Sequence, residues 1–399
     1  MAHLGRTLRD LNKYRRPWAK LMEGSALPNV SPMSAPSRLR EVTAFGSNPG
    51  NLRMLTYVPE NLAPSSPLVV VMHGCTQTAA GYDHGAGWSA LADRYGFALL
   101  FPEQRQANNQ RLCFNWFQSG DIERDQGEPL SIRQMIGRMS RDHGLDAGRV
   151  FVTGLSAGGA MTAVMLATYP ELFAGGAIVA GLPYGCATNV QEALECMYQG
   201  RTRSGREWGD LVRAASPHRG PWPKLSVWHG SADATVKAVN AHEILKQWRD
   251  VHGLPAQPSS EGMVDGYPRQ VWRNADGQDV IESFTITSMA HGTPLAAAGS
   301  ENAYGAAGPF LLEVGISSTY HIAAFWGLTG QAVRPAANDA ALVSPSGVVE
   351  FPTPRRPAAQ TDWAADQRAP SHGQWNAGSL ATDIQAIIDK ALKVAGLKS

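Results

Sequence analysis

Short runs of apolar residues, each followed by a segment with helical periodicity, constrain the fold of this chain most. The runs at 67–74 and 149–154 are apolar at almost every position. Such runs are typical of parallel strands that are buried on both faces. Their alternation with helices predicts an α/β fold, namely a mostly parallel central sheet with helices on both faces. We expect strands at 52–60, 67–74, 97–103, 149–154, 174–183, 224–230 and 280–288, and helices at 88–96, 157–173 and 240–253.

The alternating pattern covers about 40–330 of the 399 residues and is interpreted as one catalytic domain. Residues 1–39 read as a basic arm with a Pro- and Ser-rich tether, 331–378 as a Pro- and Ala-rich linker or extension, and 379–399 as an amphipathic C-terminal helix. We expect the arm and the helix to pack against the domain. The alternatives are binding of the arm to a membrane, hydrophobic granule or polymer surface, and formation of a homo-oligomer through the terminal helix.

Charge and hydropathy exclude several classes of partner. The formal net charge is +1, so the overall balance implies no nucleic-acid partner. No apolar run reaches the roughly 18–20 residues that cross a bilayer. Basic residues interrupt the N-terminus too often for the apolar segment of a signal peptide, which favours a cytoplasmic protein. The four cysteines keep secretion open, because an even count is compatible with disulfides in an oxidising compartment.

The four cysteines allow three pairings. We favour Cys75 with Cys113 and Cys186 with Cys196, because the second pair is close in sequence and can close a short loop. The alternative is four free, mostly buried thiols. None of the spacings suits a zinc site, and no metal is expected.

A Gly-x-Ser-x-Gly motif at 154–158 stands between an expected buried strand and an expected helix. In that context the serine occupies a sharp, strained turn that presents its hydroxyl above the sheet. The helix N-terminus behind it favours developing negative charge. The motif therefore predicts that Ser156 is a nucleophile.

A serine nucleophile needs a histidine base that a carboxylate orients, in the chain order Ser, Asp, His for this fold. Asp233 directly follows the strand at 224–230, and His291 follows the strand at 280–288 with a glycine beside it. We predict that these two complete a triad with Ser156. His229 and His321 are interpreted as core or supporting residues.

Acyl transfer also needs donors for the oxyanion. The fold supplies one N–H group from the residue after the nucleophile and one from the loop after an earlier strand. In this sequence those two positions are Ala157 and Cys75, so we predict that their backbone N–H groups form the oxyanion hole. A cysteine nucleophile at position 75 is the competing reading, and the lack of a strand-turn-helix context around it argues against that reading.

Six motifs in order resemble the esterases of the poly(3-hydroxybutyrate) depolymerase family over about residues 45–328. They are His73-Gly74-Cys75-Thr76-Gln77, Pro102-Glu103-Gln104, Cys113-Phe114-Asn115-Trp116, Gly154-Leu155-Ser156-Ala157-Gly158, Gly181-Leu182-Pro183-Tyr184-Gly185 and His229-Gly230-Ser231-Ala232-Asp233. The resemblance implies an α/β-hydrolase fold and hydrolysis of short-chain hydroxyalkanoate esters or, as in related members, of feruloyl or acetyl esters on plant polysaccharides. It also implies that Cys75 belongs to the oxyanion hole and Trp116 to the acyl-binding cleft.

Trp88, Trp116 and Trp222 are candidates for the cleft wall, because a wide aromatic face can hold an apolar ester chain or a ferulate ring. The predicted activity is acyl transfer to water through an acyl-enzyme, and it needs no cofactor. A serine peptidase of the same fold and a non-catalytic surface-binding protein are the alternatives.

Overall fold

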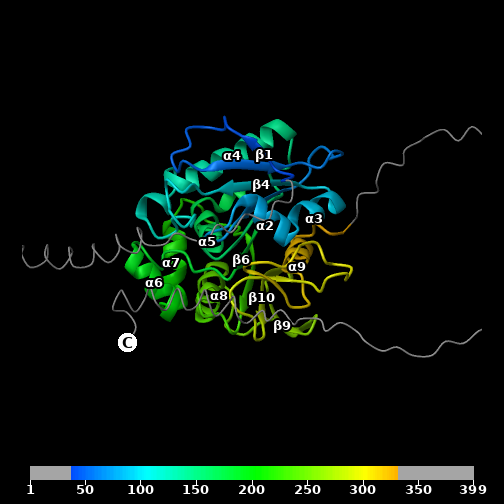
Figure 1. The fold of residues 1–399 in the computed structure, drawn as a ribbon. Helices are drawn as coiled ribbons and strands as arrows, with labels where there is room; N and C mark the ends of the chain where they lie inside the picture. Colours follow the sequence, from blue (N-terminus) through cyan, green and yellow to red (C-terminus); the bar gives the residue numbers. More distant parts are fainter. Residues whose placement is uncertain (1–36, 331–399) are drawn as a thin grey trace, which may run out of the picture. The chain divides into compact units, whose positions relative to one another are not determined.

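The computed structural model describes residues 37–330, and its centre is a ten-stranded mixed sheet (Figure 1). The strands of this sheet are β1 (Arg40–Val42), β2 (Arg53–Tyr57), β3 (Leu68–Met72), β4 (Ala98–Glu103), β5 (Val150–Leu155), β6 (Gly175–Val179), β7 (Lys224–Gly230), β8 (Ser260–Val264), β9 (Tyr267–Arg273) and β10 (Asp279–Ile286). Their order across the sheet is β1-β2-β4-β3-β5-β6-β7-β10-β9-β8. The six strands from β4 to β10 in that order pair in parallel, and the four outer strands run antiparallel to their neighbours. The predicted mostly parallel sheet is confirmed.

Helices cover both faces of the sheet (Figure 1). They are α2 (Ala79–Ala86), α3 (Trp88–Tyr95), α4 (Gly127–His143), α5 (Ala157–Thr168), α6 (Val190–Gln199), α7 (Gly205–Ala214), α8 (Val239–His252) and α9 (Ser318–Phe325), with short 3-10 helices at Ser119–Asp121 and Pro170–Leu172. Helices α4 to α8 contribute to one apolar cluster, and α2, α3 and α9 contribute to the other. A two-stranded parallel sheet of β11 (Thr293–Leu295) and β12 (Leu311–Glu313) follows β10.

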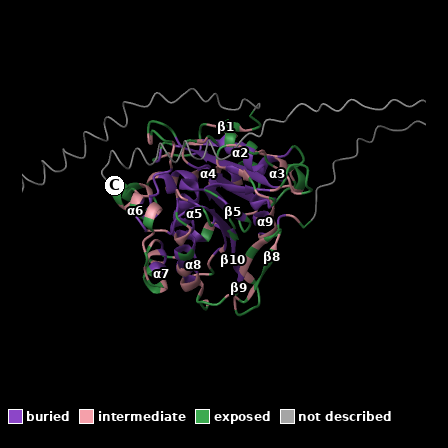
Figure 2. Cartoon of the chain, turned by 60° about the horizontal axis from the view of Figure 1, so that its bottom comes forward, coloured by how far each residue is buried: buried purple, intermediate pink, exposed green. Residues whose placement is uncertain are grey.

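The central strands are apolar throughout because both of their faces are covered. All five residues of β3 and all six of β5 are buried (Figure 2). In β3, Leu68, Val70 and Met72 enter one cluster, whereas Val69 and Val71 enter the other, as the two-residue repeat of a strand requires. The sheet therefore separates two hydrophobic cores, and its parallel strands end at one common edge.

The elements that the sequence prediction omitted include α4 and the hairpin of β8 and β9. Helix α4 buries Ile132, Met135, Ile136 and Met139, which have helical spacing, so its signal was present in the sequence. Strand β8 buries none of its residues, and Met263 is 64% exposed, so apolar periodicity could not reveal it.

Several predictions concern segments that the structure does not describe. The linker at 331–378, the terminal helix at 379–399 and all but the last three residues of the basic arm at 1–39 lie outside the described residues. Within 37–330, no helix is both long and apolar enough to span a membrane.

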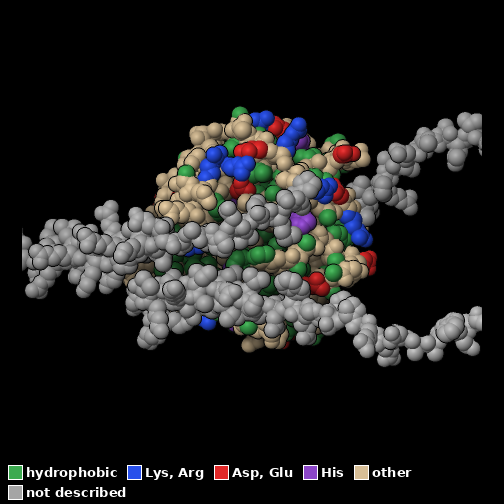
Figure 3. Space-filling view, viewed as in Figure 1, with side chains coloured by type: hydrophobic (Ala, Val, Ile, Leu, Met, Phe, Trp, Pro, Cys, Tyr) green, Lys and Arg blue, Asp and Glu red, His purple; other side chains and the backbone are tan. Residues whose placement is uncertain are grey.

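Charged side chains of both signs are interspersed on the described surface. On the face in Figure 3, basic and acidic side chains lie beside one another. Near the N-terminal edge of the sheet, Arg38 pairs with Asp93, and Arg53 pairs with Glu41. Exposed pairs of this kind contribute little to stability, so the fold depends on its two buried cores.

One of the two predicted disulfides is present. Cys75, after β3, is bonded to Cys113, in the segment after β4. The predicted bond between Cys186 and Cys196 is wrong, because both are buried free thiols. The Cys196 thiol instead donates to the Cys186 carbonyl oxygen at 2.9 Å. Short sequence spacing places these residues beside each other, but a disulfide also requires a specific geometry, which spacing alone does not supply.

This arrangement predicts two free thiols per chain. Thiol titration of the denatured, unreduced protein should detect two groups, and titration after reduction should detect four. Reduction should also lower the free energy of unfolding by about 2–4 kcal/mol, because the bond joins residues 38 positions apart. A Cys75→Ser, Cys113→Ser variant is the control, since reductant should not change its stability. Four thiols before reduction would contradict the pairing.

Candidate active site

A sharp turn between β5 and α5 carries Ser156. Its backbone has φ 58° and ψ −116°, a conformation that L-residues rarely adopt. The glycines on either side permit it, since a Cβ on Gly154 would lie 2.4 Å from the Gly158 carbonyl carbon, and one on Gly158 would lie 2.4 Å from the Met72 oxygen. The predicted strand-turn-helix context is therefore present, and the turn packs directly against the end of β3.

The structure brings Ser156, His291 and Asp233 into one hydrogen-bonded chain. His291 Nδ1 lies 2.7 Å from Asp233 Oδ2, and His291 Nε2 lies 2.9 Å from Ser156 Oγ. Since Asp233 accepts at Nδ1, that nitrogen carries the proton, and Nε2 is free to accept from the serine hydroxyl. Ser156 and His291 each retain 9% exposure, whereas Asp233 is more deeply buried.

Asp233 is held as a carboxylate. Its Oδ1 accepts the backbone N–H groups of Thr235 and Val236, both at 2.8 Å. Burial acts to raise the pKa of Asp233, but hydrogen bonds from His229 and His291 overcome this effect and hold the pKa well below its usual range. The carboxylate therefore stays ionised and can orient the His291 ring.

Adjacent strands bring the two loops of the triad together. Strands β7 and β10 are parallel neighbours, and Asp233 and His291 follow their carboxyl ends. The Ala232 N–H donates to the Met289 oxygen at 3.0 Å, which ties one loop to the other. A Cβ on Gly230 would lie 2.2 Å from that same oxygen, so this close approach requires glycine.

Two backbone N–H groups, predicted from the sequence to bind an oxyanion, are free in the described part of the structure. Those of Cys75 and Ala157 donate to no partner among the described residues. The 73–77 loop is held in place by three bonds: the Thr76 N–H donates to the Arg111 oxygen, Gln77 Oε1 accepts from the Gly74 N–H, and the disulfide joins Cys75 to Cys113. Thr76 has φ 63°, which is an outlier for a β-branched residue.

A buried polar network supports this loop. His73 Nδ1 donates to the Gly74 oxygen, and His73 Nε2 accepts from the Gln104 N–H at 3.2 Å. Burial lowers the pKa of His73, which favours the neutral ring that this pairing needs. Glu128, fully buried on α4, accepts from the Gln104 side chain and the Asn115 N–H, and burial raises its pKa well above the usual range. Neither His73 nor Glu128 was assigned this role from the sequence.

Two of the three tryptophans predicted for the cleft wall lie elsewhere. Trp88 is 2% exposed and stacks on Trp326 in the core, so no substrate can reach it. Trp222 packs against Trp248 at the amino end of β7. The seven residues of β7 place it roughly 20 Å from the catalytic end, at about 3.3 Å per residue. Both predictions are wrong, because residue type alone does not specify which end of a strand a side chain lies at.

Trp116 remains a prediction. It is 6% exposed and belongs to the same apolar cluster as helices α4 to α8. It follows Cys113 in the segment that the disulfide and Glu128 hold, and its ring packs edge-on against Phe117.

Phe310 is an aromatic residue beside the triad that the sequence analysis missed. Its ring centroid lies 5.9 Å from that of His291, with the planes at 75°. Its φ is 63°, in the left-handed region, and its carbonyl oxygen accepts from the Thr293 N–H. A half-buried aromatic side chain held in such a conformation next to a reactive histidine is typical of a functional site. The only signal in the sequence is its place after a Gly-Pro pair.

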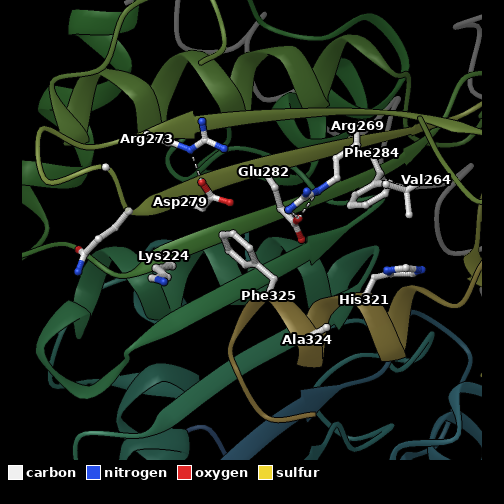
Figure 4. Close-up of a pocket in the computed structure, with 12 residues that line it drawn as sticks. Lys224, Val264, Arg269, Arg273, Asp279, Glu282, Phe284, His321, Ala324 and Phe325 are labelled. Carbon is white, nitrogen blue, oxygen red and sulfur yellow. Dashed lines mark hydrogen bonds and ion pairs between the residues drawn. The ribbon is translucent and has the colours of Figure 1, made fainter. Parts of the chain in front are cut away.

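A cavity of about 750 Å³ lies away from these residues, between β9, β10 and α9 (Figure 4). Lys224 and Asp279, which line it, stand at the amino ends of their strands, opposite the triad. Four of its charged groups pair with one another: Arg269 with the buried Glu282, and Arg273 with Asp279. The described residues contain no cluster of three or more His, Cys, Asp or Glu side chains that could hold a metal ion.

Comparisons with known proteins agree with this geometry. A family model described as Esterase PHB depolymerase matches residues 53–259. Poly(3-hydroxyalkanoate) depolymerase C of Paucimonas lemoignei is 46% identical over 308 residues, which cover 76% of this chain and 74% of that protein. Feruloyl esterase B of Neurospora crassa is 36% identical over 253 residues, covering 61% and 84%. The solved acetyl xylan esterase from Aspergillus awamori superposes with a TM-score of 0.62 at 27% identity, covering 73% of this chain and 99% of that one. The resemblance inferred from the six motifs is confirmed, and the chain belongs to the Esterase PHB depolymerase family of hydrolases that act on carboxylic esters.

Proposed function

We propose that this protein hydrolyses short-chain hydroxyalkanoate esters through an acyl-enzyme on Ser156. The observation that carries the proposal is the chain of two hydrogen bonds from Ser156 through His291 to Asp233, beside two unpaired backbone N–H groups. A non-catalytic binding protein has no need for this arrangement. The 46% identity to a poly(3-hydroxyalkanoate) depolymerase supports the substrate class.

In the first half-reaction, Ser156 Oγ attacks the ester carbonyl carbon while its proton passes to His291 Nε2. The carbonyl oxygen becomes an oxyanion that the N–H groups of Cys75 and Ala157 bind, and the N-terminus of α5 adds favourable potential. The C–O bond to the alcohol then breaks, and His291 returns the proton to the departing oxygen. Ionised Asp233 stabilises the imidazolium form of His291 between the two transfers.

In the second half-reaction, water takes the place of the alcohol. The water oxygen attacks the acyl carbon while His291 removes a proton from the water. The N–H groups of Cys75 and Ala157 bind the second oxyanion. Breakage of the bond to Ser156 Oγ, with return of the proton, releases the carboxylic acid and regenerates the serine.

Ser156→Ala should fold normally and lose nearly all turnover of p-nitrophenyl butyrate. Only one hydroxyl is removed, while the oxyanion donors and the binding surface remain, so residual catalysis of about 10³–10⁴-fold over water can persist. Ser300→Ala, the same change at an exposed serine, is the control and should be fully active. Retention of more than a few per cent of activity in Ser156→Ala would disprove the assignment of the nucleophile.

Asp233→Asn should lower kcat by about 10⁴-fold, because an amide favours the wrong tautomer of the histidine.

The low pKa of Asp233 also links this residue to stability. An Asp whose pKa is depressed on folding stabilises the native state above its unfolded pKa of about 3.9, and this contribution is lost as the pH falls below that value. Urea unfolding at pH 5 and pH 3 should therefore show a smaller loss of stability for Asp233→Asn than for the wild type. An equal loss would mean that Asp233 is not held as a carboxylate.

The substrate class is tested with hydroxybutyrate oligomers, methyl ferulate and acetylated xylan side by side. We expect the highest kcat/KM on the oligomers; a clear preference for either of the other two would replace the proposed substrate with that ester.

Trp116→Ala should lower kcat/KM more for an oligomer than for an acetyl ester, because a fully buried aromatic side chain contributes on the order of 2 kcal/mol. Trp222→Ala is the matched control and should affect all substrates equally. Equal losses for Trp116→Ala would make that residue structural.

A further inference from the structure

We propose that His229 is a positioning residue of the active site, which orients the Asp233 carboxylate through its Nε2–H group. The inference rests on the proposed triad and adds a second histidine to it. His229 lies on β7, four residues before Asp233, and its side chain is 3% exposed. It touches no reacting atom, so it would act only through Asp233.

Hydrogen bonding defines the tautomer of His229. Its Nε2 lies 2.7 Å from the Val236 carbonyl oxygen, which can only accept, so Nε2 carries a proton. The same nitrogen lies 3.4 Å from Asp233 Oδ2, the oxygen that accepts from His291. The Nε2–H group therefore donates to the Val236 carbonyl oxygen, and its nitrogen also lies at ion-pair distance from the carboxylate, where it helps to lower the pKa of Asp233.

Val236 closes a small network around the carboxylate. Its N–H donates to Asp233 Oδ1, and its carbonyl oxygen accepts from His229. His229 thus holds the 233–236 turn from the strand side, while His291 contacts the carboxylate from the opposite loop. Within the described residues, Asp233 is the carboxylate that lies within ion-pair distance of His229, so no other acid competes for its N–H group.

The other ring nitrogen of His229 is unfavourable for the stability of the fold. His229 Nδ1 is buried and has no hydrogen-bond partner among the described residues. An unpaired buried polar atom is unfavourable, and an apolar side chain of similar size would avoid that cost. The gain that balances it is the Nε2–H group, which faces the one carboxylate on which the His291 orientation depends.

The test compares His229→Leu, which removes the donor, with His229→Gln, whose amide nitrogen can occupy the Nε2 position. We expect kcat/KM for p-nitrophenyl butyrate to fall by about 10- to 100-fold in His229→Leu, as for loss of one hydrogen bond to a charged group, with KM nearly unchanged. His229→Gln should recover most of this loss. His229→Asn, whose amide is too short to reach the same point, should resemble His229→Leu.

The pH profile separates positioning from a structural role. Without the His229 donor, Asp233 Oδ2 directs more of its negative charge at His291 and stabilises the imidazolium form. The acidic limb of the kcat/KM profile should therefore move to higher pH in His229→Leu. A purely structural effect of the substitution would lower the plateau of kcat/KM and leave the pH of its acidic limb unchanged.

Wild-type activity in a folded His229→Leu, or equal losses in the Leu and Gln variants, would overturn the proposal. If His229→Leu does not fold, the proposal is tested by comparing kcat/KM of His229→Gln with that of His229→Asn. Equal values in these two variants would contradict it. Failure of the triad itself is recognised separately, because Ser156→Ala would then remain active.

Discussion

The close packing of the turn between β5 and α5 against the end of β3 determines where the chemistry of this protein can lie. The turn between β5 and α5 passes so near to β3 that Gly158 faces the Met72 and His73 carbonyl oxygens with no room for a Cβ. This contact raises Ser156 above the carboxyl edge of the sheet and sets it beside Cys75, which follows β3. Backbone packing thereby brings Ser156 and Ala157 next to the segment that carries Cys75, before any side chain of the triad contributes.

The base and its carboxylate depend on a second constraint, the pairing of β7 with β10. Because these strands are parallel neighbours, the loops that follow them leave the sheet side by side and exchange backbone hydrogen bonds. Asp233 is buried there at an energetic cost, which its N–H donors offset. The result is a charge of defined orientation in a site of low dielectric constant, where it acts more strongly on His291 than it would in water.

The loop that carries Cys75 is held differently, by a covalent bond and a buried polar network. The disulfide joins the 73–77 loop to the segment that carries Trp116, and Glu128 of α4 accepts a hydrogen bond from the Asn115 N–H of that segment. Phe310 approaches from the opposite side and packs edge-on against His291. Three segments far apart in the sequence thus contribute to the surroundings of the triad.

The sequence by itself determined the α/β class, the seven principal strands and the order Ser156, Asp233, His291, because each leaves a local pattern: an apolar run, a Gly-x-Ser-x-Gly turn or a motif at a strand end. Only the tertiary structure decided which aromatic residues stand near the nucleophile, that Cys186 and Cys196 stay reduced, and that His229, Glu128 and Phe310 surround the site. These outcomes depend on strand order and on the direction of individual side chains. Both result from the packing of distant segments, which no local spacing records.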